Sequence, residues 1–152
     1  MKRILVGVDG SKYSLDAVKA AGKLANERNI KSVTLLNVIP VIVSNSGTSL
    51  VTDFSEDLEA WEIFEKPKAI LKAVGVEAKL LLREGDPAFE IIHVAETEGY
   101  DLIVVGHRGL SPIKAFLLGS VSNRVVSHAP CSVLVVRLGL ENSVESGGHN
   151  GK

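Results

Sequence analysis

Three glycines, a guanidinium and the hydroxyls of Ser120 and Ser122 gather in the segment VVGHRGLSPIKAFLLGS, residues 104–120, and just after it. Glycine adopts positive φ angles without strain, and it lets backbone N–H groups approach an anion without an intervening side chain. The spacing of Gly106, Gly109 and Gly119 therefore fits a cradle for phosphate. The alternative is that these glycines only turn a long loop.

The residues around the last glycine strengthen the phosphate interpretation. We expect a helix to begin at Ser120, and the start of a helix offers free N–H donors and a partial positive charge of about half a unit. The hydroxyls of Ser120 and Ser122 can donate hydrogen bonds, and Arg108 can add a charged one. No catalytic residue stands out among them.

The glycine pattern differs from two familiar phosphate-binding loops. No Gly-Lys-Ser/Thr follows it, as a Walker A loop requires, and Lys114 lies in the middle of the loop. The second apolar strand ends Val38-Ile39-Pro40, without the acidic residue that binds ribose in a dinucleotide fold.

Strands and helices alternate along the chain. Short apolar runs predict five strands, and caps with apolar periodicity predict the helices between them. The expected strands are 4–8, 33–39, 76–82, 102–105 and 132–137, and the expected helices are 11–28, 53–74, 87–98 and 120–127. This order implies right-handed crossovers and a single-domain α/β fold, an open five-stranded parallel sheet of Rossmann-like type with helices on both faces. Such sheets bind ligands beyond the carboxyl ends of their strands.

Several local features refine this expectation. Pro67 should kink or split the helix over 53–74, because proline crowds the preceding turn. Gly75 suits the left-handed position after a helix end. The alternating strand 76–82 indicates a sheet edge. We expect 40–52 to be a loop of low order and the tail, 138–152, to be flexible.

Bulk composition excludes some classes of protein. The 152 residues are 45% hydrophobic and 23% charged, with a formal net charge of −1. Attraction to nucleic acid or to an anionic membrane has little support at this charge. One cysteine, Cys131, cannot form an internal disulfide. Because no signal peptide or membrane-spanning run is apparent either, we expect a cytoplasmic protein that binds neither nucleic acid nor membrane.

Three motifs together carry a family resemblance. Val-Asp-Gly-Ser at 8–11, Gly106-x2-Gly109-x9-Gly119-Ser120, and His-Ala-Pro-Cys-Ser-Val-Leu-Val-Val-Arg at 128–137 resemble the universal stress protein family over residues 1–137. His107 stands where that family often has a small hydroxyl residue. The resemblance implies a strand order of 3-2-1-4-5, frequent dimerisation, and, for the branch with this glycine motif, ATP binding.

The resemblance also implies a set of nucleotide-binding residues. Those at the adenine and ribose side would be Asp9, beside Val8, and Val38. Those around the ribose and phosphates would be Val105, Gly106, Arg108, Gly109, Gly119, Ser120, Val121 and Ser122.

Asp9 has two interpretations of its own. It follows the first strand and precedes Gly10-Ser11, so it could contact a ligand or act as a turn or capping residue. As a ligand contact it would accept bonds from adenine or ribose. It could also hold Mg²⁺ or Mn²⁺ through water, because Mg²⁺ usually keeps several waters beside nucleotide phosphates.

The last strand suggests a homodimer. Its residues are Ser132, Val133, Leu134, Val135 and Val136. The family-like strand order puts this apolar strand at a sheet edge, and an exposed apolar edge favours pairing with another chain about a twofold axis. Alternatively, the tail or a helix of the same subunit covers the edge.

Two classes of function remain at this stage. The first is an ATP-binding universal stress protein, a homodimeric regulatory module in the stress response with slow or no turnover. The second is an enzyme, a slow ATPase or a nucleotidyl- or phosphoryl-transfer enzyme on the same fold. Phosphoryl transfer needs an oriented nucleophile, and none is identifiable, which favours the first class.

Overall fold

The computed structural model describes residues 1–41, 58–109 and 118–137. The elements in chain order are β1 (Ile4–Gly7), α1 (Lys12–Glu27), β2 (Ser32–Ile39), α2 (Leu58–Glu62), α3 (Glu65–Ala73), β3 (Glu77–Glu84), α4 (Pro87–Thr97), β4 (Leu102–Gly106), α5 (Ser120–His128) and β5 (Ser132–Val136). The predicted alternation of strands and helices is confirmed. The strand boundaries differ from the predicted ones by no more than two residues. The expected loop residues 42–52, the helix start at 53–57 and the tail, 138–152, lie outside the described residues.

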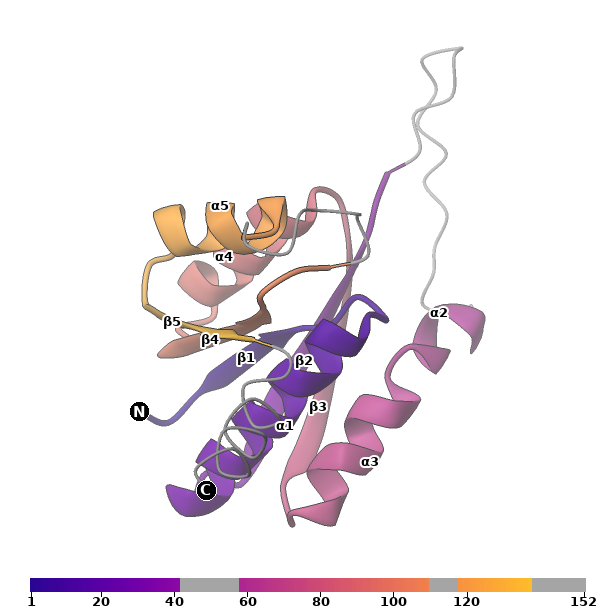
Figure 1. Cartoon of the computed structure of the whole chain (residues 1–152), viewed down its shortest axis with the longest axis vertical. Helices are drawn as coiled ribbons and strands as arrows, with labels where there is room; N and C mark the ends of the chain where they lie inside the picture. Colours follow the sequence, from indigo (N-terminus) through magenta and orange to yellow (C-terminus); the bar gives the residue numbers. More distant parts are fainter. Residues whose placement is uncertain (42–57, 110–117, 138–152) are drawn as a thin grey trace, which may run out of the picture.

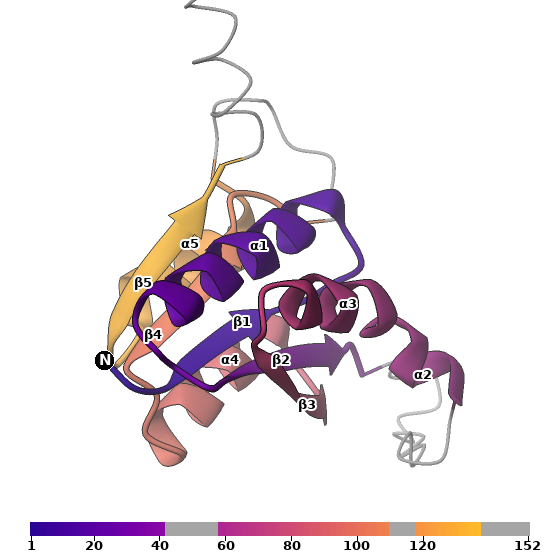
Figure 2. The same cartoon turned by 90° about the horizontal axis from the view of Figure 1, so that it is seen from below.

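The strands form a single parallel sheet in the order β3-β2-β1-β4-β5, as predicted. Figures 1 and 2 show α1 and α3 on one face of this sheet and α4 and α5 on the other. The strand order reverses between β1 and β4, because the chain first builds outward from β1 to β3 and then returns to add β4 and β5. A crevice forms at such a reversal, beyond the carboxyl ends of the two central strands.

Each face of the sheet has its own apolar core. Alternate strand residues point to opposite faces: Ile4 and Val6 pack with α1 and α3, whereas Leu5 packs with α4 and α5. The central strands β1 and β4 are buried on both sides, which explains why they appear in the sequence as continuous apolar runs.

The starts of the helices follow from their capping residues. The Ser11 hydroxyl accepts a hydrogen bond from the Ser14 N–H at the start of α1, and the Asp86 carboxylate accepts one from the Phe89 N–H at the start of α4. Pro87 occupies the first turn of α4, where a missing N–H removes no intrahelical bond. Gly75 has φ +75° after α3, as predicted.

The predicted helix over 53–74 is divided, but the break precedes Pro67. Helix α2 ends at Glu62 and α3 begins at Glu65, so Pro67 lies in the first turn of α3. A proline ring clashes with the carbonyl of the residue four positions earlier, here Ile63. The chain therefore leaves the helical path at residues 63–64, and the proline occupies a position that tolerates it.

Strands β3 and β5 are the two edges of the sheet. The edge position of β3 matches the alternating pattern seen in the sequence. No helix within the described residues is long and apolar enough to cross a membrane.

Candidate functional site

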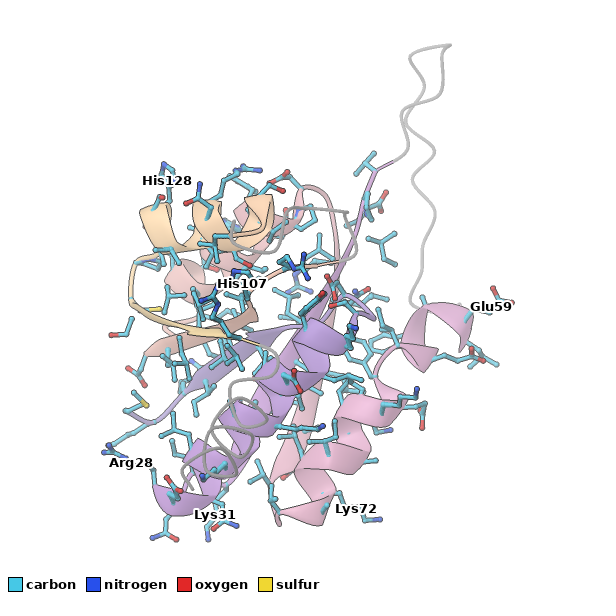
Figure 3. The ribbon with its side chains drawn as sticks, in the orientation of Figure 1. Arg28, Lys31, Glu59, Lys72, His107 and His128 are labelled. Atoms are coloured by element: carbon cyan, nitrogen blue, oxygen red, sulfur yellow. The ribbon has the colours of Figure 1, made fainter. Side chains whose placement is uncertain are left out.

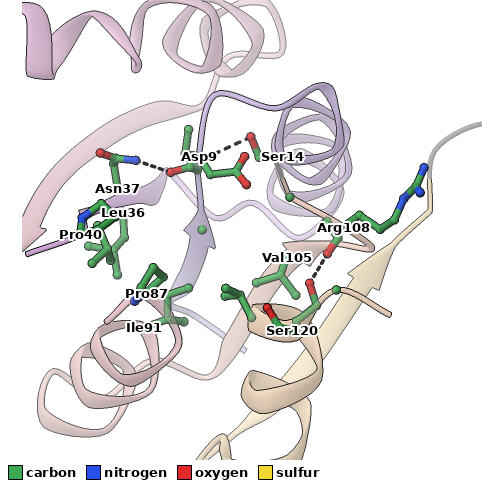
Figure 4. A pocket seen from close by; sticks show the side chains of 18 of the residues that line it. Asp9, Ser14, Leu36, Asn37, Pro40, Pro87, Ile91, Val105, Arg108 and Ser120 are labelled. Carbon is green, nitrogen blue, oxygen red and sulfur yellow. Dashed lines mark hydrogen bonds between the residues drawn. The ribbon is translucent and has the colours of Figure 1, made fainter. Parts of the chain in front are cut away.

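A pocket of about 400 Å³ opens at the carboxyl ends of β1, β2 and β4. This volume lies within the range of about 300–1,000 Å³ typical of small-molecule sites. The pocket lies at the reversal of strand order, the position expected for ligands in an open parallel sheet. In Figure 4 its labelled side chains come from the strand ends and from the starts of α1, α4 and α5.

The lining contains every residue predicted for nucleotide binding: Val8, Asp9, Val38, Val105, Gly106, Arg108, Gly109, Gly119, Ser120, Val121 and Ser122. These residues come from four separate stretches of the chain, and the parallel sheet brings the strand ends among them to one edge. Their role toward a nucleotide stays a prediction.

The missing side chains of the three loop glycines leave room for neighbouring groups. None of these glycines is among the described glycines with positive φ, so of the two properties of glycine considered in the sequence it is the absent side chain that the structure uses here. A Cβ at Gly106 would lie 2.7 Å from the Tyr13 carbonyl oxygen, and one at Gly119 would lie 3.2 Å from the Cα of Arg108. A side chain at Gly106 would push the first turn of α1 away from the end of β4, and one at Gly119 would force a small shift between α5 and Arg108.

Gly109 leaves room for a carboxylate. A Cβ there would lie 2.5 Å from Asp9 Oδ2. The other carboxylate oxygen, Oδ1, accepts a hydrogen bond of 2.9 Å from the Ser11 N–H. Asp9 therefore acts as a turn residue through one oxygen, while its second oxygen lies against Gly109 of the glycine loop (residues 106–109 and 118–119). The two interpretations of this residue are therefore compatible.

The start of α5 faces the pocket, with one difference from expectation. Gly119 occupies the N-cap position and offers no side chain to the first-turn N–H groups. The Ser122 hydroxyl, however, donates a 2.6 Å hydrogen bond to the Gly106 carbonyl. Because a hydroxyl has a single proton, Ser122 in this arrangement ties α5 to the end of β4, and Ser120 is the serine whose hydroxyl stays available to a ligand.

Arg108 lines the pocket, but its guanidinium contacts Tyr13. Its Nη2 donates a hydrogen bond to the Tyr13 hydroxyl, and its Cζ lies 4.8 Å from the centre of the Tyr13 ring. In Figure 4 the Arg108 side chain extends away from the other labelled pocket residues. A direct contact between this guanidinium and a phosphate requires it to leave Tyr13.

His107 lies beside the pocket and outside its lining. Burial lowers the pKa of His107, and the positive charges of Arg137 and Arg108 lower it further. The imidazole is therefore a neutral group near pH 7. Figure 3 shows His107 in the middle of the molecule, whereas Arg28, Lys31 and Lys72 lie at its lower end, away from the strand ends that form the pocket.

Sequence reasoning missed several pocket residues. Asn37, within β2, donates a 2.7 Å hydrogen bond from Nδ2 to the Val8 carbonyl and thereby joins two strand ends. A polar residue inside an apolar strand was the available signal for it. Pro87 and Ile91 form the wall from α4, and nothing in their local sequence distinguishes them from ordinary helix residues.

Within the described parts of the chain, no group of three or more His, Cys, Asp or Glu side chains could hold a metal ion. Asp9 and Arg108 are the charged residues that line the pocket there. The arrangement thus offers one carboxylate, the N–H groups of a helix start and a hydroxyl around a mostly apolar cavity. This combination is typical of the ligand sites that α/β proteins carry at a strand-order reversal.

Comparison with known proteins assigns the family. Residues 1–137 match the profile described as the universal stress protein family. Universal stress protein YxiE of Bacillus subtilis is 36% identical over 145 residues, covering 89% of this chain and 98% of that protein. The chain belongs to the universal stress protein family.

Solved structures agree with this assignment. Universal stress protein UspA from Lactobacillus plantarum superposes with a TM-score of 0.76 at 26% identity, covering 90% of this chain and 97% of that one. A universal stress protein in complex with cAMP gives a TM-score of 0.68 at 29% identity, covering 90% of this chain and 96% of that one. The sheet order and the Rossmann-like architecture are therefore those of the family.

Proposed function

We propose that this universal stress protein binds ATP, together with Mg²⁺ or Mn²⁺, in the pocket at the strand-order reversal. In this proposal it acts as a regulatory module of the stress response, with slow or no turnover of the nucleotide. The observation that carries the proposal is that the glycine loop, the start of α5 and Asp9 line one cavity.

The two ends of the cavity suit different parts of a nucleotide. Val38, Ile91 and Val105 offer apolar contacts to a base. The N–H groups at the start of α5 and the Ser120 hydroxyl suit phosphate oxygens, because the helix start is partly positive. The structural neighbour in complex with cAMP, at 29% identity, supports an adenine nucleotide as the ligand class.

A divalent cation would balance the charge beside the glycine loop. Asp9 Oδ2 lies close to Gly109, where the phosphates of a bound nucleotide would bring further negative charge. Mg²⁺ binds through few protein carboxylates and keeps most of its waters. We therefore assign to Asp9 a water-mediated contact with the cation that accompanies the phosphates.

The proposed assembly is a homodimer through β5. This strand is a sheet edge, and Leu134 on it is 38% exposed although it is a large apolar residue. Antiparallel pairing of two β5 strands about a twofold axis would satisfy the unpaired backbone groups and cover Leu134.

Calorimetric titration with ATP and Mg²⁺ tests the nucleotide site. The Ser120→Ala variant removes a hydroxyl donor to phosphate, and we expect the dissociation constant to rise roughly tenfold, as for loss of a hydrogen bond to a charged group. The Gly109→Val variant should bind more weakly still, because its side chain would occupy the position of Asp9 Oδ2 and block the approach of backbone N–H groups.

Ser127→Ala is the matched control for Ser120→Ala. Ser127 lies on the same helix, is exposed, and its hydroxyl donates to the Asn123 carbonyl. We expect this variant to bind ATP as the wild type does. Equal ATP affinity in wild type, Ser120→Ala and Gly109→Val would refute the phosphate cradle.

Phosphate release distinguishes a binding module from an enzyme. We expect release from ATP to stay near background with Mg²⁺ or Mn²⁺ present, because the described pocket holds no oriented nucleophile or general base beyond Asp9. A rate of about 1 per second or faster, within the usual range of enzymes, would favour an ATPase instead.

A further inference from the structure

Arg108 is the cationic side chain among the described residues that line the pocket. A phosphate chain would attract it, because a guanidinium binds phosphate oxygens through charged, often bidentate hydrogen bonds. The position of this one side chain therefore influences how the pocket responds to the charge of its ligand.

The guanidinium rests on Tyr13. One of its N–H groups donates to the Tyr13 hydroxyl, and its Cζ lies 4.8 Å from the ring centre, which is a cation–π geometry. Tyr13 belongs to the first turn of α1.

The backbone of Arg108, in contrast, lies at the start of α5. A Cβ on Gly119, the N-cap residue of that helix, would be 3.2 Å from the Cα of Arg108. The side chain thus leaves the chain next to the anion-attracting helix start and turns away toward Tyr13. To turn toward that helix start, the guanidinium would have to rotate about the bonds of its side chain.

The backbone of Tyr13 is held by packing. Its carbonyl oxygen lies 2.7 Å from the position of a Cβ on Gly106, so the first turn of α1 is packed directly on the end of β4. The next turn of α1 is buried through Ala17 and Val18 in the core. The Tyr13 ring therefore projects from a backbone that is anchored beside the start of the loop.

We propose that Tyr13 is a specificity-determining residue that competes with the phosphate chain of the ligand for Arg108. The inference rests on the proposed nucleotide site and concerns how the affinity of that site depends on the phosphate charge of the ligand. A nucleoside leaves the Arg108 guanidinium on the Tyr13 ring. The phosphates of ATP can pair with the guanidinium only after it has left that ring. Tyr13 therefore reduces the preference of the pocket for ATP over adenosine.

Titrations of adenosine and of ATP with Mg²⁺, at one fixed ionic strength, test this competition. In Tyr13→Leu we expect the dissociation constant of ATP to fall about fivefold, the equivalent of one cation–π contact, while that of adenosine stays unchanged. Tyr13→Phe keeps the ring and loses the hydroxyl acceptor, so its ATP affinity should lie between those of the wild type and Tyr13→Leu.

Arg108→Gln supplies the control background. In that background Tyr13→Leu should leave the ratio of ATP to adenosine affinity unchanged, because the cation for which the two partners compete is gone. Circular dichroism of each variant verifies the fold, and Tyr13→Phe keeps the test decisive if Tyr13→Leu does not fold.

The outcomes separate this inference from the proposed function. If wild-type protein binds neither adenosine nor ATP, the proposed function fails. If it binds both and the ratio is the same in wild type, Tyr13→Phe and Tyr13→Leu, the competition is refuted while the nucleotide site stands. A lower ATP affinity in Tyr13→Leu would also overturn the inference, because it would mean that Tyr13 holds Arg108 ready for phosphate.

Discussion

At the residue scale, the glycine loop shows how one residue type serves two different physical needs. Gly75 and Gly99 have positive φ and end helices, which is the use of glycine that depends on backbone freedom. Gly106 and Gly119 instead allow α1 and α5 to approach the end of β4. Close approach depends on the neighbours in space, so the sequence indicated that a missing side chain was useful there but did not identify α1 and α5 as the neighbours.

His107 gives a prediction on pH dependence. Its pKa is lowered in the folded protein by burial and by Arg137 and Arg108. The unfolded chain therefore takes up a proton below about pH 6.5 that the folded protein does not. We expect the contribution of His107 to the free energy of unfolding to be complete above that pH. This contribution should decrease as the pH falls toward the pKa of His107 in the folded protein. Urea unfolding in a series from pH 7 to pH 5 measures this decrease.

The His107→Asn variant identifies the group responsible. Its free energy of unfolding should fall less steeply between pH 7 and pH 5 than that of the wild type. His93→Asn, a change at an exposed residue of α4, should keep the wild-type slope. An unchanged slope in His107→Asn would assign the pH dependence to other groups.

At the scale of elements, the residues at the start of α4 cap the helix, form an ion pair with α5 and contribute to the pocket wall. Asp86 accepts from the Phe89 N–H and lies 3.0 Å from Arg124 Nη1 on α5. These contacts, the Arg124 hydrogen bond first, hold the pKa of Asp86 below its ordinary value. The next residue, Pro87, lines the pocket, so Asp86 positions this wall relative to α5.

Substitution of Asp86 separates the cap from the ion pair. Asp86→Ala should lower the free energy of unfolding by about 1–2 kcal/mol, because it removes an N-cap and a solvent-exposed pair. Asp86→Asn should cost less than about 1 kcal/mol, since asparagine caps helices about as well as aspartate. Urea unfolding measures both. Equal losses in the two variants would mean that the pair with Arg124 outweighs the cap.

At the scale of the whole molecule, the two sheet edges differ. Edge strand β3 carries charged residues on its exposed positions, a pattern that discourages pairing with another chain. Edge strand β5 has Leu134 exposed, while Val133 and Val135 pack toward the core beneath α5. The apolar edge is therefore the one proposed for the dimer.

Sedimentation velocity tests this interface. Leu134→Lys should shift the wild-type dimer toward monomer, because a symmetric interface places two added charges near each other. Leu134 is a better position for this change than Val135, whose side chain contributes to the core. Leu58→Lys, at a residue 82% exposed on α2, is the control and should stay dimeric. A monomeric wild type would contradict the proposed assembly.

The sequence by itself determined the order of strands and helices, the caps at Ser11 and Asp86, and the glycine and serine residues that line the pocket. These features depend on local periodicity, on capping chemistry and on motifs, all of which can be recognised in short stretches of sequence. Even the division of the helix near Pro67 followed from local sterics, although the break lies at residues 63–64.

Only the tertiary structure decided how those residues are used. It showed that Ser122 ties α5 to β4, that Asn37 joins β2 to the end of β1, and that Arg108 rests on Tyr13, 95 residues away in the chain. The physical reason is that each of these contacts joins side chains and backbone groups from different elements. Their distances are fixed by the packing of helices on the sheet, which no local pattern in the sequence encodes.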